Sequence, residues 1–169
     1  MVRHDERSDG AGHKPRNIGI RPARPLDATP LYKLLAKYFE EAPVGYPPID
    51  EKVAMAWGLS VVIKGGVTVA IEDNRIIGTV GLEMGTLPWC NAPYLNAVWL
   101  YVVPERRAGG TPDKLVQVAK DIAAKNKMPL RLDNIWGLRP EAQDRWRRRH
   151  GFTYVGGNNV WFPAKQGGA

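Results

Sequence analysis

The stretch with the clearest chemical potential joins a strand-like apolar run to the start of a helical pattern. It reads Pro104-Glu105-Arg106-Arg107-Ala108-Gly109-Gly110-Thr111-Pro112, which is made mainly of small residues and carries two arginines. Glycines let main-chain N–H groups converge without obstruction, and a helix start adds unpaired donors and a positive dipole end. The stretch therefore predicts an anion-binding turn that would fit a diphosphate. Its glycines could instead serve only the bend of a tight connection.

The residues after this turn have the spacing of a helix with one buried side. Three residues favour a helix start: Thr111 as the cap, Pro112 in the first turn, and Asp113 at the positive end of the dipole. The apolar positions that follow share one face, and they are Leu115, Val118, Ala119, Ile122 and Ala123. We therefore expect a helix that starts at the turn and packs along one side.

The other residue types that could do chemistry are scattered. Of the three histidines, His4 and His13 lie near the start of the chain and His150 shares a helix face with apolar residues. The single Cys90 has no histidine at a recognisable spacing. We expect no metal site and no cysteine nucleophile.

The elements that must position the turn follow from apolar spacing. Strand patterns cover residues 18–22, 67–72, 76–84, 95–103 and 129–135, and a terminal hairpin is expected over residues 153–162. Helical patterns begin at Asp27, Asp50, Thr111 and Pro140. This order predicts an α/β fold with a mixed, mostly antiparallel sheet of about seven strands. A central strand-helix-strand crossover joins the two sides of the turn, and helices cover both faces.

The whole chain of 169 residues is the size of one domain and is 44% hydrophobic and 24% charged. We predict a polar, disordered tail over residues 1–16, one domain over 17–163 and a flexible tail over 164–169. The longest apolar stretch, Val53 to Ile63, is about half of what a membrane span needs. A single cysteine and the lack of a secretory signal favour the cytoplasm.

The run from Leu100 to Gly110 resembles the acetyl-CoA motif of the GNAT superfamily of N-acyltransferases. In that motif a strand ends in Val-x-Pro and leads into Arg/Gln-x-x-Gly-x-Gly/Ala, so that Arg107 and Gly110 fall on signature positions. Further similar segments are Ile20-Arg21-Pro22-Ala23 upstream, and Leu130-Arg131-Leu132-Asp133-Asn134 and Trp146 to Phe152 downstream. The resemblance covers roughly residues 17–163.

The resemblance implies that acetyl-CoA is the acyl donor and that no metal takes part. Main-chain groups of Leu100 and Val102 would bind the pantetheine arm in a gap between two central strands. The diphosphate would lie on main-chain amides of the turn, which come from Arg107, Ala108, Gly109, Gly110, Thr111 and Asp113. The acceptor would be a small-molecule or protein amine near the loops Tyr46–Ile49 and Leu87–Tyr94.

Direct acetyl transfer needs a deprotonated amine and a group that receives or stabilises the leaving thiolate. Glu83 is the first candidate base and Asp133 the second. Tyr101 is a candidate proton donor. The tyrosine that often serves this purpose in the family is replaced here by Arg147, whose charge could stabilise a thiolate.

Two departures from the motif keep an alternative open. Pro112 stands where the family has a small residue with an amide hydrogen, and Arg147 stands where it has the tyrosine. With a net charge of +7, the chain could instead be a GNAT-fold module without catalysis that binds nucleic acid or an acidic partner. A third possibility is an unrelated α/β domain. We favour the enzyme over nucleic-acid binding, leave a homodimer open and expect no membrane partner.

Overall fold

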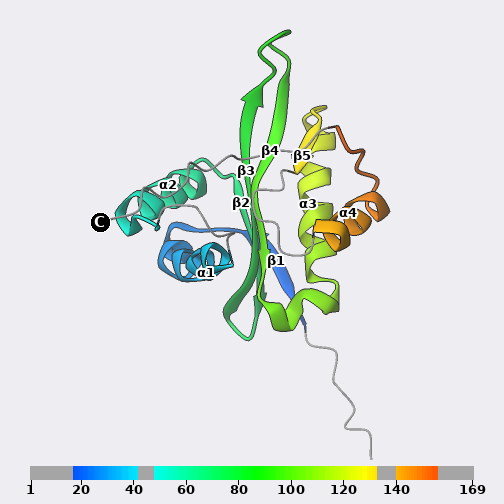
Figure 1. Ribbon diagram of the computed structural model, residues 1–169. Coiled ribbons are helices and arrows are strands. Elements are labelled where there is room, and N and C mark those ends of the chain that lie inside the picture. Colours follow the sequence, from blue (N-terminus) through cyan, green and yellow to red (C-terminus); the bar gives the residue numbers. More distant parts are fainter. Residues whose placement is uncertain (1–16, 42–47, 133–139, 156–169) are drawn as a thin grey trace, which may run out of the picture.

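Apolar alternation in the middle of the chain builds five strands that pair in chain order into one sheet. The computed structural model describes residues 17–41, 48–132 and 140–155 (Figure 1). All neighbouring strands pair antiparallel except the last two, which are parallel. The strands are β1 (Gly19–Pro22), β2 (Val67–Glu72), β3 (Arg75–Thr86), β4 (Pro93–Val102) and β5 (Leu130–Leu132).

In the described ranges, four α-helices cover the two faces of this sheet, as the sequence predicts. They are α1 (Ala28–Glu40), α2 (Glu51–Ile63), α3 (Thr111–Lys125) and α4 (Pro140–Arg149). Figure 1 shows α1 and α2 on one side of the strands and α3 and α4 on the other. Short 3₁₀ turns, η1 (Pro25–Asp27) and η2 (Pro104–Gly109), precede α1 and α3.

Local signals fix two of these boundaries. Asp50 caps α2, because its Oδ1 accepts a hydrogen bond from the Val53 amide at 3.1 Å. The β2–β3 turn is made by Asp73 and Asn74, both in the left-handed region with φ of 47° and 61°. This is the turn geometry that suits the twist of a two-residue hairpin.

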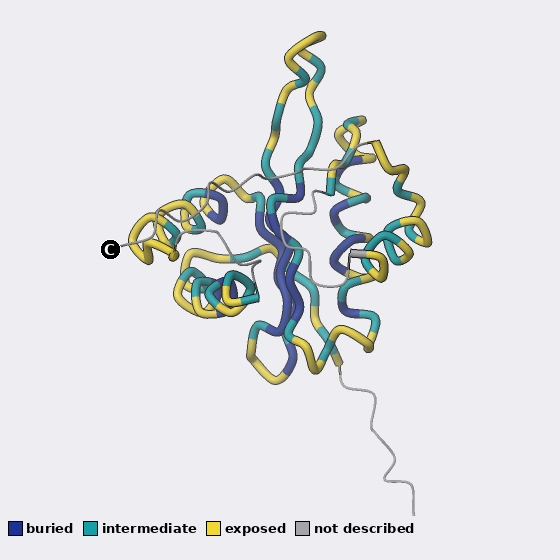
Figure 2. Tube along the Cα trace, in the orientation of Figure 1, coloured by how far each residue is buried: buried dark blue, intermediate teal, exposed yellow. Residues whose placement is uncertain are grey.

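Two apolar layers hold the sheet between its helices, and the buried residues concentrate on the middle strands (Figure 2). On one face, Val80, Leu82 and Val102 pack against Leu115 and Ala119 of α3. On the other face, the layer below α1 and α2 comprises Leu31, Leu35, Val61, Val62, Val67, Val69 and Trp99. Alternate residues of β3 and β4 therefore belong to different layers.

The expected number of about seven strands is wrong for the described residues, which form five. The difference comes from the predicted hairpin over residues 153–162. Thr153 to Val155 are not strand, and the remainder of that hairpin lies outside the described residues. For Thr153 to Val155 the local pattern predicted a strand, but a strand needs a pairing partner, which a local pattern does not supply.

Within the described ranges, none of the helices has both the length and the apolar character that crossing a lipid bilayer requires.

A close contact in the middle of the sheet gives a stability prediction. A Cβ added at Gly81 would collide with the indole ring of Trp99, which lies over this glycine. We expect Gly81→Ala to lower the free energy of unfolding by about 1–3 kcal/mol, measured by urea denaturation. The matched control is Gly58→Ala, since a Cβ there meets nothing within 4 Å and would raise helix stability by up to about 1 kcal/mol. Equal free energies of unfolding for Gly81→Ala and the unchanged chain would contradict the close packing of Trp99 on Gly81.

Candidate acyl-CoA and acceptor site

The turn between β4 and α3 presents a main-chain amide that the protein itself does not use. Gly110 adopts a left-handed conformation with φ of 77° and stands at the N-cap position of α3. Its N–H has no hydrogen-bond partner among the described residues. Thr111 and Asp113 follow in the first turn of the helix, where amides lack an intrahelical acceptor. The turn thus offers donors to an anion.

Thr111 differs from its expected role. It was predicted to cap α3, but the structure makes it the first helical residue, and no side chain caps this helix. Thr111 is fully buried, and its Oγ1 has no hydrogen-bond partner. The left-handed Gly110 takes the cap position because its lack of a Cβ allows that conformation. A buried hydroxyl without a partner therefore lies beside the free amide.

The side chain of Arg107 is held by the protein. Its Nε donates to the Val102 carbonyl at 2.8 Å, and its Nη2 lies 2.7 Å from Glu41 Oε1 at the end of α1. Its guanidinium also lies 5.3 Å from the centre of the Tyr101 ring. Arg107 thereby ties the turn to α1.

An extra residue on β4 shifts the register of its ladder with β3. Gly81 pairs with Trp99 and Leu82 with Ala97, so Val98 is a β-bulge. The pairing of β4 with β5 covers Leu95, Asn96 and Ala97 and goes no further within the described residues. The residues that follow Leu132 lie outside the described part of the chain.

Leu100 and Val102 direct their peptide groups to the side of β4 that faces away from β3. Antiparallel neighbours alternate between pairs that exchange hydrogen bonds and pairs that do not. The Val103 amide donates to the Ile77 carbonyl. Leu100 and Val102 therefore belong to pairs that exchange no hydrogen bonds with β3. The bond from Arg107 to the Val102 carbonyl agrees with this assignment, since that carbonyl is free of the ladder.

Tyr101 lies on the opposite face, towards α1. It is buried, its ring packs 5.5 Å from Tyr38, and its hydroxyl donates to Glu41 Oε1 at 2.9 Å. Burial and this hydrogen bond to Glu41 raise the pKa of Tyr101 to about 12. The phenol is therefore protonated at neutral pH and is already engaged by a carboxylate.

Glu83 lies half-buried on the face of α1 and α2, because its neighbour Leu82 belongs to the α3 layer. Across the β3–β4 ladder it stands opposite Asn96. In the described part of the chain, Glu83 has no hydrogen-bond or ion-pair partner, and Asn96 Oδ1 is buried without one. The other carboxylate predicted from the sequence, Asp133, falls outside the described residues.

The start of α3 is also the contact point for α4. Asp113 Oδ1 accepts from Trp146 Nε1 at 2.7 Å and lies 2.8 Å from His150 Nε2. These two partners, the Trp146 hydrogen bond first, lower the pKa of the Asp113 carboxyl. His150 therefore has a packing role between α3 and α4, and Asp113 anchors a helix beside the turn.

The arginines of α4 are partly engaged within the helix. Arg147 Nη2 donates to Gln143 at 3.0 Å, and Arg148 forms an ion pair with Asp144 at 2.8 Å. No observation favours the use of this face on nucleic acid. The described residues also contain no group of three His, Cys, Asp or Glu side chains that could share a metal ion.

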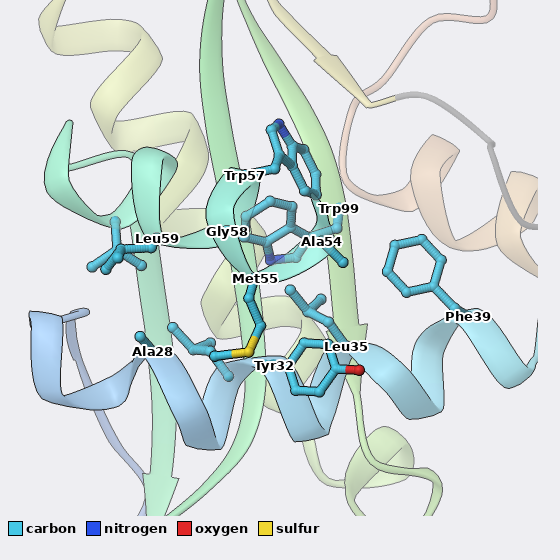
Figure 3. Close-up of a pocket in the computed structure, with 12 residues that line it drawn as sticks. Ala28, Tyr32, Leu35, Phe39, Ala54, Met55, Trp57, Gly58, Leu59 and Trp99 are labelled. Carbon is cyan, nitrogen blue, oxygen red and sulfur yellow. The ribbon is translucent and has the colours of Figure 1, made fainter. Parts of the chain in front are cut away.

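An apolar groove lies between α1 and α2 and ends on β4 (Figure 3). Trp57 of α2 packs edge-on against Trp99, with ring centres 4.9 Å apart. The other lining residues are Ala28, Leu31, Tyr32, Leu35, Phe39, Ala54, Met55, Gly58, Leu59 and Val62. The groove and Glu83 share the same side of the sheet.

Sequence reasoning missed Glu41 and Asn96. Glu41 is 60 residues from Tyr101 and 66 from Arg107, and no spacing rule links them. Asn96 lay inside a predicted strand, where only its polar character among apolar neighbours was a signal.

The unpartnered hydroxyl gives a prediction about stability. Replacing Thr111 by Val removes a buried polar group that has no partner, so Thr111→Val should raise the free energy of unfolding by about 1 kcal/mol. Thr79→Val is the matched control, because the Thr79 hydroxyl is buried, donates to the Thr68 carbonyl at 3.0 Å and accepts from Trp99 Nε1 at 3.3 Å. The Thr79→Val substitution should lower the free energy of unfolding by about 1–3 kcal/mol. Chemical denaturation measures both, and a destabilised Thr111→Val would show that its hydroxyl has a partner.

No family model matches this chain, and no curated protein is similar to it in sequence. Solved structures do match its fold. A ribosomal-protein-alanine N-acetyltransferase from Brucella melitensis biovar Abortus 2308 has a TM-score of 0.63 at 18% identity, covering 86% of this chain and 98% of that one. A GCN5-related N-acetyltransferase from Ralstonia eutropha JMP134 has a TM-score of 0.64 at 18% identity, covering 87% of this chain and 98% of that one. A predicted acetyltransferase with acetyl-CoA from Clostridium acetobutylicum has a TM-score of 0.63 at 18% identity, covering 88% of this chain and 96% of that one.

Proposed function

We propose that this chain, which has the fold of the GNAT acetyltransferases, transfers an acetyl group from acetyl-CoA to a primary amine. Donor and acceptor would be bound together, and the amine would attack the thioester directly. Structural neighbours that include N-acetyltransferases, and one solved with acetyl-CoA, support this reading.

The observation that carries the proposal is the pair of unused polar groups at the start of α3. The Gly110 N–H and the Thr111 hydroxyl have no partner among the described residues, although Thr111 is fully buried. A buried polar group without a partner is costly, so a ligand that bonds it gains affinity. The Gly110 amide can donate to a diphosphate as the turn stands, whereas the fully buried Thr111 hydroxyl can do so only after the turn shifts on binding.

The remaining donors follow from the turn. We assign the diphosphate of CoA to main-chain amides between Arg107 and Asp113, which include those of Ala108, Gly109, Gly110 and Thr111. Pro112 is the second residue of α3 and contributes no amide hydrogen. The Thr111 hydroxyl is a donor close to Pro112, which lacks the amide hydrogen.

The pantetheine arm would run along the side of β4 that faces away from β3. Leu100 and Val102 turn their peptide groups to this side, so they can pair with the amides of the arm as a neighbouring strand would. The Val102 carbonyl is held by Arg107 Nε. Donor binding would therefore either share this carbonyl or release Arg107 from it.

In the proposed reaction a C–N bond forms at the acetyl carbonyl and the C–S bond breaks. Glu83 would take the amine proton, directly or through water, and Asp133 is the second candidate for this role. For the leaving thiolate we retain Tyr101 and Arg147. Tyr101 would have to donate a proton despite its raised pKa and its bond to Glu41, whereas Arg147 would stabilise the thiolate by charge alone.

Acetyl-CoA should raise the melting temperature of this protein. A ligand at about 100 times its dissociation constant adds about 2.7 kcal/mol, which corresponds to roughly 5–10 °C for a chain of this size. The Thr111→Val variant should bind acetyl-CoA about 10-fold more weakly, because it loses a hydrogen bond to a charged group. Calorimetric titration of both proteins measures this. An unchanged melting temperature at millimolar acetyl-CoA would refute the proposed function.

Loss of the candidate base should slow turnover without weakening the donor complex. We expect Glu83→Gln to lower kcat by about 10²–10⁴-fold in an assay of free thiol release, with unchanged affinity for acetyl-CoA. Glu141→Gln on the exposed surface of α4 is the matched control and should keep full activity. If Glu83→Gln turns over normally, the base is another group, and Asp133→Asn becomes the decisive variant.

A further inference from the structure

Helix α2 is apolar around its whole circumference. From Val53 to Ile63 it contains no charged residue, and Ser60 carries the one hydroxyl of this segment. A helix that is apolar on all sides is normally buried on all sides. In this structure Val61 and Val62 are the buried residues of α2, and they face the sheet and α1. The opposite side of the helix therefore carries apolar residues without a described cover.

That opposite side is a regular stripe along the helix. Its members follow one another at spacings of three, four and three residues, and they are Val53, Ala56, Ser60 and Ile63. Val53 is 65% and Ile63 69% exposed, Ala56 is exposed, and Ser60 is half-buried. Alternating steps of three and four residues are the spacing with which one helix packs along another. We call these four residues the α2 seam.

The α2 seam is distinct from the apolar groove. The residues of α2 that line the groove are Ala54, Met55, Trp57, Gly58, Leu59 and Val62. Figure 3 shows this groove on the side of α2 that faces α1. A partner on the seam would therefore occupy a surface that the proposed reaction does not use.

The side chains of the seam are small in its middle and branched at its ends. Ala56 and Ser60 would let a second helix approach closely, and Val53 and Ile63 lie about 15 Å apart along the axis. A helix of the same sequence that runs in the opposite direction presents Ile63 to Val53 and Ser60 to Ala56. The α2 seam is therefore complementary to itself about a two-fold axis.

The charges at the two ends of α2 favour this antiparallel direction. Asp50, Glu51 and Lys52 lie at its start, two acids and one base, whereas Lys64 follows its end. Antiparallel packing brings the acidic start of one helix to the Lys64 end of the other and opposes the two helix dipoles. Parallel packing would bring like ends together. Because the seam itself is uncharged, two chains of net charge +7 can meet there without charged side chains in the contact.

We infer that the protein forms a two-fold dimer in which the α2 seams of two copies pack antiparallel. The interface of a stable dimer buries about 800 Å² on each partner, which is more than one helix of about 20 Å provides. Further exposed apolar side chains flank α2: Leu26 on η1 is 92% exposed, and Ile49 before the helix is 40% exposed. The dimer requires no acyl-CoA, so its failure would leave the proposed function untouched.

Sedimentation velocity of the full chain, from low micromolar to submillimolar concentration, tests the dimer. The mass should rise with concentration to twice the 18.8 kDa of one chain. Ala56→Glu should weaken the dimer at least about 100-fold, because it places an unpaired carboxylate in the middle of the seam. Ala124→Glu is the matched control, since it replaces an exposed alanine on α3, and it should dimerise normally.

Two results of this experiment would overturn the inference. One is a monomer at all concentrations, and the other is a dimer that Ala56→Glu leaves intact. Both alanines are exposed on helices, so both variants should keep the fold, and circular dichroism of each variant checks this.

Cysteine cross-linking tests the antiparallel packing itself. Val53→Cys and Ile63→Cys are prepared as separate chains with Cys90→Ser, because Cys90 is exposed. Mixed and oxidised, the two variants should form a disulfide with each other, since the packing brings these positions together. Each variant alone should not, because its two copies lie about 15 Å apart and a disulfide spans less than about 7 Å between Cα atoms. Cross-linking of Val53→Cys with itself would indicate parallel helices and refute the arrangement.

Discussion

At Val98 the ladder between β3 and β4 contains one extra residue on β4, and the candidate site depends on this bulge. A bulge leaves a residue unpaired and bends the strand that carries it. In this chain the pairing of β4 with β5 covers Ala97 and goes no further among the described residues. The peptide groups of Leu100 and Val102 point to the side of β4 that faces away from β3, and this is the side proposed for the pantetheine arm.

The site contains several polar groups without partners, and these groups lower the stability of the folded protein. The Gly110 amide, the Thr111 hydroxyl and Asn96 Oδ1 are unpaired in the described structure, whereas the buried Thr79 hydroxyl donates to the Thr68 carbonyl. Each unpaired buried group lowers stability by about 1–3 kcal/mol. Such groups are tolerated where a ligand supplies the missing bond, and here they occur at both ends of the proposed reaction.

Glu41 connects these two ends. It binds the Tyr101 hydroxyl and the Arg107 guanidinium with the same carboxylate, so the end of α1 is tied to the turn proposed for the diphosphate. Arg107 also holds the Val102 carbonyl on the edge proposed for the donor. Any movement of Arg107 on donor binding would therefore change the contacts of α1, which forms one wall of the apolar groove.

The sequence alone determined the local elements: the order of the five strands and four helices, the start of a helix at Asp50, and a glycine turn that opens α3. These follow from residue type and short-range spacing, which act over a few residues. Tertiary structure alone decided that Gly110 and not Thr111 takes the cap position, that Glu41 holds Tyr101 and Arg107, and that Glu83 stands opposite Asn96. Those contacts join residues on separate strands and helices, and only the register of the sheet, set by the bulge at Val98 and by packing, brings them together.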